Sequence, residues 1–242
     1  IINEFQKYHT QYNFKFLNAD CIFMKDNKMR IAAAPGPVSY PLVAYSLERD
    51  DVELTFSKED SNADAVFDST VSLIKRGLRI DYVTVRGLMV LTPGMGRRIA
   101  VPTNRESSII LAKALAASRG GIELLPANDP LDAMAALKRG LADSAVVTAN
   151  LAPGVRFEDL LGFVPGSCGV HVNGDAEAVL KVYEEGITML RRPGISMKIA
   201  AKLPVNVKPD FIDGVIRSVE WGIRKLDYEE FKSVVSSLDA SL

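Results

Sequence analysis

The chain has 242 residues, of which 48% are hydrophobic and 24% are charged, a composition typical of a globular protein with one domain or two closely joined lobes. Its 29 basic and 30 acidic residues give a formal net charge of −1, and no block of like charge stands out. The sequence therefore lacks the electrostatic signature of a nucleic-acid-binding protein, and we expect no DNA or RNA partner.

Cysteine content and apolar runs exclude two further classes. Cys21 and Cys168 are the only cysteines, which is enough for one bridge but too few for a disulfide framework or a cysteine-only metal site. No run approaches the roughly 20 apolar residues of a membrane-spanning helix, so we expect no transmembrane segment. The first residues lack the basic start and apolar core of a secretion signal. These features fit a cytoplasmic protein, and equally an extracytoplasmic one whose leader was removed before Ile1.

Residues 1–28 are polar and aromatic, and we interpret them as an N-terminal extension. The stretch CIFMKDNKMRIAAA predicts two strands around a turn at residues 26–28, because Asp and Asn tolerate turn geometry. A folded region that starts at Met24 or Met29 fits the same pattern.

From Met29 onward the pattern predicts strands that alternate with short helices. MRIAAA is typical of a buried strand, and Ser39 is expected to be the N-cap of a short helix after a Pro-Gly-Pro break. VELTFS and ADAVF follow as strands. Asp68 and Ser69 then cap the helix STVSLIKR, which Gly77 ends.

A second series begins after residues 92–94, Thr-Pro-Gly, which end the long β-rich run DYVTVRGLMVL. Thr103 and Glu106 form a T-x-x-E capping box ahead of an apolar helix face. Asp129 caps the next helix, Gly140 ends it, and SAVVT follows as a buried strand. Strands separated by helices of this size predict parallel βαβ units, because a parallel crossover needs about a dozen residues.

The last third of the chain is predicted to be mostly helical. FVPGSCGVHV is a β-rich run that returns the chain to the first lobe. Residues 175–242 are predicted to form helices, with breaks at Pro193-Gly194 and Leu203-Pro204.

Four segments carry a resemblance to a known superfamily: RIAAAPGPVSYPLVAYSLE, ADAVFDSTVSLIKRG, GRRIAVPTNRESSIILAKAL and DPLDAMAALKRGLADSAVVT. Between Arg30 and Gly186 the chain resembles the type II periplasmic-binding proteins, especially the solute-binding components of ABC importers for small organic molecules. The resemblance implies an α/β fold in the form of a two-lobed clamp. Its βαβ lobes would be joined by two crossing segments, residues 82–91 and 163–172.

The resemblance also implies a polar or carboxylated small-molecule ligand between the lobes, and an ABC permease as partner. Lobe one would comprise residues 29–91 and 163–242, and lobe two residues 92–162. Loops at strand ends would hold the ligand, because helix starts supply unpaired N–H donors and partial positive charge. By position, the candidate ligand contacts are Ser39, Tyr40, Asp68, Ser69, Thr70, Thr103, Asn104, Arg105, Thr148 and Asn150.

Structural interpretations compete with these roles. Serine, threonine and aspartate are residue types that any helix start prefers. Glu106 argues against an anion at its helix, because a capping-box carboxylate opposes negative charge, whereas Arg105 would offset it. Tyr40 fits either a ligand contact or a half-buried surface tyrosine. Arg86, in a β-rich run, would need a partner if buried, which is either a ligand carboxylate or an acidic side chain.

Catalytic interpretations have less support in the sequence. His9 and His171 are the only histidines, and Cys168 and His171 would point to opposite faces of a regular strand. No dinucleotide fingerprint, P-loop or zinc-spaced ligand set occurs, so we expect no cofactor and no metal.

Two alternative functions share the two-lobed architecture. Some menaquinone-pathway enzymes are similar clamps that act on carboxylated substrates, but residues 148–150, Thr-Ala-Asn, stand where that group commonly has a histidine. The effector-sensing half of a transcription regulator is a third candidate, and no helix-turn-helix precedes residue 29.

Overall fold

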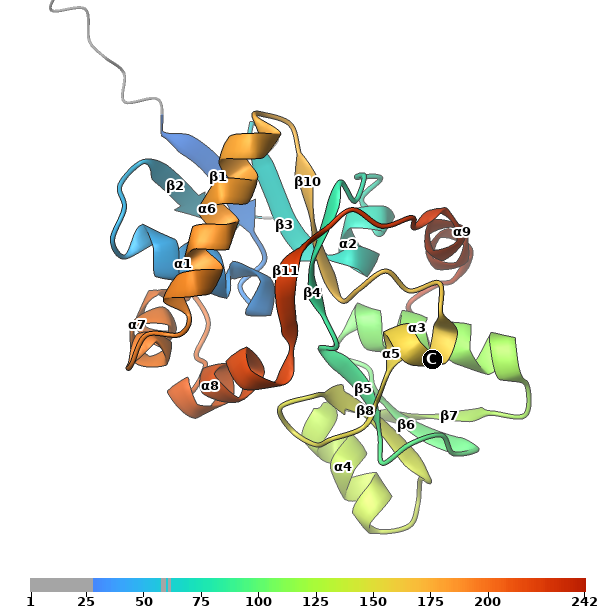
Figure 1. Cartoon of the computed structure of the whole chain (residues 1–242). Helices are drawn as coiled ribbons and strands as arrows, with labels where there is room; N and C mark the ends of the chain where they lie inside the picture. The colour runs from blue at the N-terminus through green and yellow to red at the C-terminus, as the bar shows by residue number, and fades with distance from the viewer. Residues whose placement is uncertain (1–27, 58–59, 61) are drawn as a thin grey trace, which may run out of the picture.

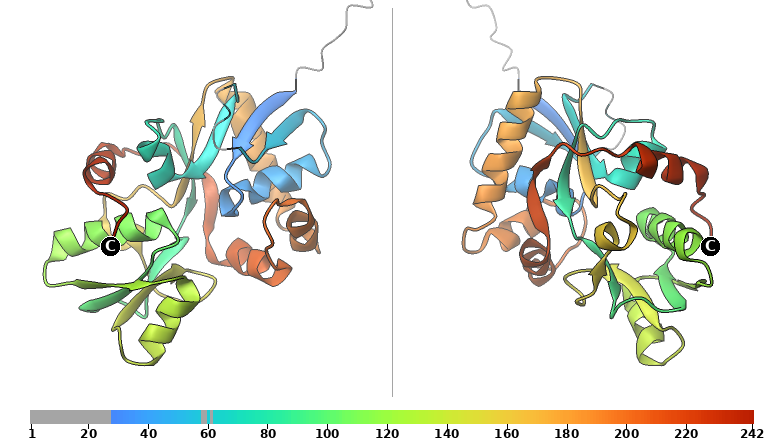
Figure 2. Two further views of the ribbon diagram at one scale, coloured as in Figure 1. Left: turned by 180° about the vertical axis from the view of Figure 1, so that it is seen from behind. Right: turned by 45° about the vertical axis from the view of Figure 1, so that its right-hand side comes forward.

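The computed structural model describes residues 28–57, 60 and 62–242. The chain forms two sheets, each with helices packed on both faces (Figures 1 and 2). The first of the two strands predicted around residues 26–28 lies outside the described residues, as do His9 and Cys21.

The larger sheet has six strands in the order β11-β4-β10-β3-β1-β2. β1 is parallel to β2 and β3, whereas β10 runs antiparallel to β3 and β4, and β11 antiparallel to β4. Helices cover both faces of β1 and β3, which explains why each strand has three consecutive buried apolar residues, 31–33 and 65–67, rather than an alternating pattern. The strands are β1 (Met29–Ala33), β2 (Val52–Thr55), β3 (Ala65–Ser69), β4 (Tyr82–Arg86), β10 (Cys168–Val172) and β11 (Glu220–Arg224).

The smaller sheet has five strands in the order β7-β6-β8-β5-β9. β6 is parallel to β7 and β8, and β5 is antiparallel to β8 and β9. The predicted parallel βαβ units are therefore present. The strands are β5 (Met89–Thr92), β6 (Arg98–Pro102), β7 (Glu123–Ala127), β8 (Ser144–Thr148) and β9 (Val155–Arg156).

The two sheets meet at the carboxyl ends of their parallel strands. β4 ends at Arg86 and β5 begins at Met89, so only Gly87 and Leu88 separate the sheets along the chain. Met89 pairs with Thr148, the last residue of β8. The loops that follow β1, β3, β6 and β8 therefore all leave their sheets at the edge facing this junction.

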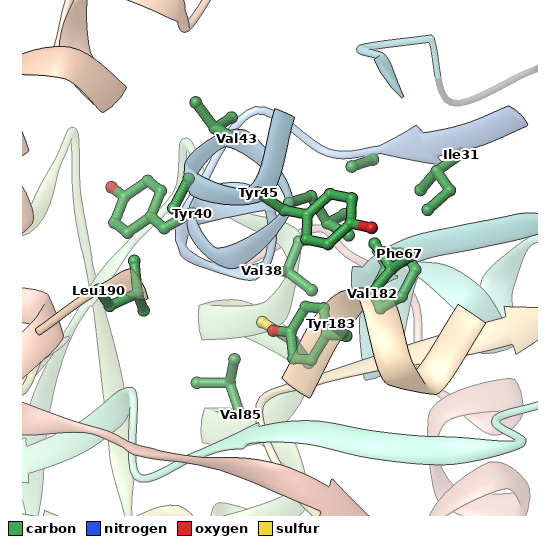
Figure 3. Packing of buried hydrophobic residues seen from close by; sticks show 14 of the residues in the cluster. Ile31, Val38, Tyr40, Val43, Tyr45, Phe67, Val85, Val182, Tyr183 and Leu190 are labelled. Carbon is green, nitrogen blue, oxygen red and sulfur yellow. The ribbon is translucent and has the colours of Figure 1, made fainter. Parts of the chain in front are cut away.

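Three apolar clusters fill the space between sheets and helices. One face of the larger sheet is covered by α1, α6, α7 and α8, where Phe67 and Tyr183 stack with ring centroids 4.9 Å apart (Figure 3). A second cluster joins α2, α3, α5 and α9, and α4 covers the remaining face. The helices are η1 (Pro37–Ser39), α1 (Tyr40–Ser46), α2 (Thr70–Lys75), α3 (Glu106–Arg119), α4 (Pro130–Lys138), α5 (Phe157–Leu161), α6 (Ala176–Met189), α7 (Ile195–Lys202), α8 (Pro209–Ser218) and α9 (Glu229–Ser237).

Several local predictions are confirmed. Ser69 caps α2, and its hydroxyl accepts from the Ser72 N–H at 3.1 Å. Asp129 caps α4, and its carboxylate accepts from the N–H groups of the next turn. Gly77 and Gly140 follow the ends of α2 and α4 with φ of 71° and 69°, the left-handed region that glycine allows.

Other predictions are wrong. The Thr103–Glu106 capping box does not form: α3 begins at Glu106 itself, with Arg105 in the N-cap position and no side-chain cap. Ser39 occupies the predicted N-cap position but makes no capping bond. The predicted all-helical end of the chain contains a strand, β11, between α8 and α9.

The expected lobe boundaries also differ from the sheet pairing. The expectation placed residues 29–91 in lobe one, yet β5 pairs with β8 and β9 of the smaller sheet. The reason is that Gly87, with φ of 72°, interrupts the long β-rich run five residues before its Thr-Pro-Gly end. We therefore propose that the lobes divide at residues 87–88.

Candidate functional site

The segment after β1 is half-buried over residues 34–37 and buried from Val38 to Tyr40. Ser39 is fully buried, and its hydroxyl donates to the Gly36 carbonyl oxygen at 2.9 Å. Tyr40 begins α1 with only 1% of its surface exposed, and its ring points away from Phe67 (Figure 3). Burial raises the pKa of Tyr40 to about 12, and the positive charge of Arg105 opposes this rise. Tyr40 is therefore a neutral hydrogen-bond donor at physiological pH.

The loop after β3 is held by its own hydrogen bonds. The buried Asp68 carboxylate accepts from the Ser69 N–H at 2.7 Å and from the Ser72 hydroxyl at 2.6 Å. The Thr70 hydroxyl donates to the Gly166 carbonyl oxygen at 2.7 Å. Asp68, Ser69 and Thr70 thus all have protein partners, which hold the conformation of the loop without help from a ligand.

The loop after β6 is more open. Thr103 is exposed, and both its N–H and its hydroxyl donate to the Ala127 carbonyl oxygen, at 2.8 and 3.1 Å. Asn104 and Arg105 are exposed ahead of α3, which has no side-chain cap. Ser108, in the first turn of α3, is fully buried, and its hydroxyl has no hydrogen-bond partner among the described residues. The start of α3 therefore keeps donor capacity that the protein does not use.

The loop after β8 carries two buried polar atoms. Thr148 is 2% exposed, and neither its hydroxyl oxygen nor the Asn150 Oδ1 has a hydrogen-bond partner in the described part of the chain. Asn150 lies against α8, since a Cβ placed on Gly214 would come within 3.1 Å of the Asn150 Cβ. A loop of the smaller sheet thus touches a helix that packs on the larger one.

Three relationships bring these loops together across the junction. The Ser69 and Ser107 hydroxyl oxygens lie 3.3 Å apart, Arg105 is close enough to Tyr40 to change its pKa, and Asn150 contacts Gly214. Ser107 is not among the residues predicted from the sequence, because its importance follows from where α3 begins.

A buried carboxylate ties the two connecting segments to each other. Glu158, on α5, is 5% exposed, and its Oε1 accepts from the Gly87 N–H at 2.8 Å and from the Ser167 hydroxyl at 3.2 Å. The Ser167 hydroxyl oxygen in turn accepts from the Leu88 N–H at 3.1 Å. Nothing in the sequence indicated this role, since the three partners come together only in the fold.

An ion pair links the two sheets at their edges. Arg156 of β9 binds the carboxylate of Glu220 of β11, and this hydrogen bond holds the pKa of Glu220 below its usual range. Arg86 stands opposite Glu220 in the β4–β11 pairing. The charge of Arg86 also helps to lower the pKa of Glu220, although no described carboxylate lies within ion-pair distance of Arg86.

Cys168 and His171 do not form a nucleophilic pair. Burial raises the pKa of the Cys168 thiol, which disfavours the reactive thiolate. His171 instead lies with its Nδ1 3.1 Å from the Asp81 carboxylate. Among the described residues, no group of three or more His, Cys, Asp and Glu side chains is arranged to hold a metal ion.

A groove lies elsewhere, between the beginnings of α7 and α8, with a volume of about 460 Å³. None of the candidate ligand contacts lines it. Its charged lining residues, Lys208, Asp210 and Asp213, are of mixed sign and therefore give it no clear preference for an anion or a cation.

Solved structures share this fold. A "Putative nitrate transport protein" from Thermoplasma volcanium has a TM-score of 0.67 at 21% sequence identity, covering 89% of this chain and 94% of that one. The ligand-binding component of an ABC-type import system from Staphylococcus aureus has a TM-score of 0.55 at 12% identity, with 87% and 91% covered. An ABC transporter protein from Parabacteroides distasonis has a TM-score of 0.51 at 13% identity, with 87% and 90% covered. The predicted two-lobed type II periplasmic-binding-protein fold is confirmed.

In the described part of the chain, no helix combines the length and apolar character needed to cross a membrane. No curated protein matches the chain in sequence. A family model described as "Protein of unknown function (DUF3834)" matches residues 24–222, which include both sheets and end within β11. The chain therefore belongs to this family.

Proposed function

We propose that this protein binds a small polar or carboxylated solute between its two lobes and delivers it to an ABC permease. Lobe one is the six-stranded sheet with its helices, and lobe two is the five-stranded sheet with its helices. The single observation that carries the proposal is the junction itself. Loops from both sheets meet there at the carboxyl ends of parallel strands, the position where open α/β sheets generally bind ligands.

The polar groups at this junction favour an anionic end on the solute. The start of α3 has no side-chain cap, and its free N–H groups and partial positive charge attract negative charge. Arg105 adds a full positive charge beside it, while Glu106 in the first turn opposes it. A carboxylate or oxyanion near Arg105 would receive charge-assisted hydrogen bonds.

Neutral groups at the junction would hold the remainder of the solute. Thr148 and Asn150 carry buried oxygen atoms without a described partner, and buried polar groups are normally hydrogen-bonded. A bound solute would supply those partners. Tyr40, neutral and close to Arg105, would donate from lobe one. We propose that Tyr40, Arg105, Thr148 and Asn150 contact the solute directly. Ser69, Thr103 and Asn104 would contact it at the rim. Ser39, Asp68 and Thr70 would act by shaping their loops.

Solute entry requires the lobes to separate. The structure has Tyr40 almost completely buried and the Ser69 and Ser107 hydroxyls in contact, as expected for a closed arrangement. Opening would move the loop after β8 away from α8, where Asn150 contacts Gly214. The links at residues 87–88 and 162–167 would absorb the backbone rotation, as hinge segments do in two-lobed binding proteins.

The relatives give this role its context. The Staphylococcus aureus structure is a ligand-binding component of an ABC-type import system, and the Thermoplasma volcanium structure carries a transport description. The alternative of a menaquinone-pathway-like enzyme has no support in these comparisons. Thr148, Ala149 and Asn150 also stand where that chemistry would need its histidine.

The test is to identify what the native protein carries. Mass spectrometry of the protein isolated from its source under non-denaturing conditions should find one small polar or anionic molecule. Adding that molecule back to refolded protein should raise the melting temperature, because a ligand at 100 times its Kd stabilises the folded state by about 2.7 kcal/mol. If no molecule co-purifies, and a library of carboxylates, oxyanions and neutral polar solutes gives no shift, the proposal fails.

A further inference from the structure

We infer that the C-terminal segment, residues 225–242, is a strap that holds the two lobes together along α2 and α3 and limits how far they open. β11 lies at the edge of the six-stranded sheet. From there the chain crosses over β4 and β10 to place α9 beside α2 and α3, drawn in red at the right of Figure 1. The strap lies beyond residues 24–222, the range of the family model.

The apolar face of α9 belongs to both lobes at once. Phe231 and Val235 are fully buried in the cluster that contains Leu73 and Ile74 of α2 together with Ile110 of α3. α2 belongs to lobe one and α3 to lobe two. Separation of these two helices would therefore expose side chains of α9 to water, which opposes opening on this side.

Adjacent residues at the end of the strap bind opposite lobes. Lys75 of α2 donates to the Leu238 carbonyl oxygen. Lys113 of α3 lies with its Nζ 2.6 Å from the Asp239 carboxylate and 3.3 Å from the Asp239 carbonyl oxygen. The Ser241 N–H and hydroxyl, at 3.1 and 2.8 Å, fix the same carboxylate. A rotation that moves α2 away from α3 must break one of these attachments.

The strap therefore makes the α2–α3 side the pivot of the clamp. On the other side, where the loop after β8 meets α8, Asn150 contacts Gly214. The Arg156–Glu220 ion pair also joins the lobes near that side, but its side chains are 37% and 42% exposed, and exposed ion pairs contribute at most about 1 kcal/mol. We expect the lobes to part at that side. This inference concerns the motion of the unliganded chain and does not rest on the identity of the solute.

The test measures the distance between the lobes without ligand. Spin labels are placed at Leu131→Cys on α4 and Met197→Cys on α7, where the native side chains are 67% and 64% exposed. Cys21→Ser removes the second thiol, and the buried Cys168 stays. Electron–electron double resonance is then recorded for this background and for Lys113→Gln, Phe231→Ala and Lys232→Gln. Lys232 is the matched control, because its ion pair with Glu229 stays within α9.

We expect a single narrow distance distribution in the background and in Lys232→Gln, and a longer, broader one in Lys113→Gln and Phe231→Ala. Far-ultraviolet circular dichroism checks that each variant is folded. Lys113→Gln keeps the test valid if Phe231→Ala does not fold, because it removes only a surface ion pair. The inference would be overturned if folded Lys113→Gln gave the same distance distribution as Lys232→Gln, and if Phe231→Ala, where it folds, did so too. Failure to find any ligand would leave these distances unchanged.

Discussion

The hydroxyl oxygens of Ser69 and Ser107 lie 3.3 Å apart although the residues are 38 positions apart in the chain. Ser69 is the N-cap of α2, and Ser107 lies in the first turn of α3. The contact places the two helix starts side by side across the junction of the sheets. Its significance is that both lobes present helix starts to the same small volume.

Ser69 and Thr103 differ in whether they cap a helix, which predicts a difference in the stability of their variants. Ser69 also accepts from the Ser72 N–H at 3.1 Å, so Ser69→Ala removes a helix cap and should lower the free energy of unfolding by about 1 kcal/mol. Thr103→Val is the matched comparison, because Thr103 caps no helix and is exposed. It should change stability by no more than about 0.5 kcal/mol. Urea unfolding measures both, and equal losses would show that Ser69 is not a working cap.

These two positions show how far local sequence patterns can predict helix starts. Ser69 and Asp129 were predicted correctly, because each bonds an N–H within three residues of itself. Thr103 has the same preferred chemistry, but its N–H and hydroxyl both bond Ala127 of the neighbouring strand. That partner is 24 residues away, and a capping pattern contains no information about it.

The Glu158 carboxylate predicts a second stability effect. It accepts from the buried Gly87 N–H and from the half-buried Ser167 hydroxyl, so Glu158→Ala leaves one buried donor unpaired and should destabilise the protein by about 1 to 3 kcal/mol. Glu158→Gln keeps an acceptor oxygen and should lose less. Equilibrium denaturation compares the two variants. Loss of the same size in both would mean that the negative charge, rather than the acceptor, is what the hinge requires.

Glu158 also marks what the sequence could not reveal. The parallel βαβ units and several helix ends followed from hydrophobic period, caps and glycine stops, and the two-lobed fold followed from a resemblance of four segments to known proteins. The hinge carboxylate did not, because Gly87 is 71 residues away and no local rule connects them. β11 was missed for a similar reason. All five of its residues are half-buried at a sheet edge, so the strand lacks the alternation that identifies one.

Close packing of α1 against α6 predicts that Gly186 cannot carry a side chain. A Cβ at Gly186 would lie 2.2 Å from the Pro41 carbonyl oxygen, which is backbone and cannot rotate away. Gly186→Ala should therefore destabilise the protein by about 1 to 3 kcal/mol, despite the higher helix propensity of alanine. Gly36→Ala is the control, since nothing lies within 4 Å of its Cβ position. Thermal unfolding that is unchanged in Gly186→Ala would contradict the packing.

The ion pair at the end of the strap predicts a dependence on pH. The Lys113 hydrogen bond, with help from Ser241, lowers the pKa of Asp239 from 3.8 to about 2. A depressed carboxyl pKa stabilises the folded state above pH 3.8, and this contribution is lost as the pH falls toward 2. An NMR titration of the Asp239 carboxyl should give a midpoint near 2, and Lys113→Gln should raise it. A midpoint near 3.8 in the unmodified chain would show that the contact does not persist in solution.

The central claim is that the loops at the junction of the two sheets bind a solute. Titration calorimetry of the co-purifying molecule tests it most directly, in the unmodified chain, in Arg105→Ala and in the surface control Lys232→Gln. We predict one molecule per chain and an affinity about 10- to 150-fold weaker in Arg105→Ala, corresponding to the roughly 1.5 to 3 kcal/mol of a hydrogen bond to a charged group. Lys232→Gln should bind as the unmodified chain does. Equal affinity in all three proteins would contradict the assignment of the solute to this junction.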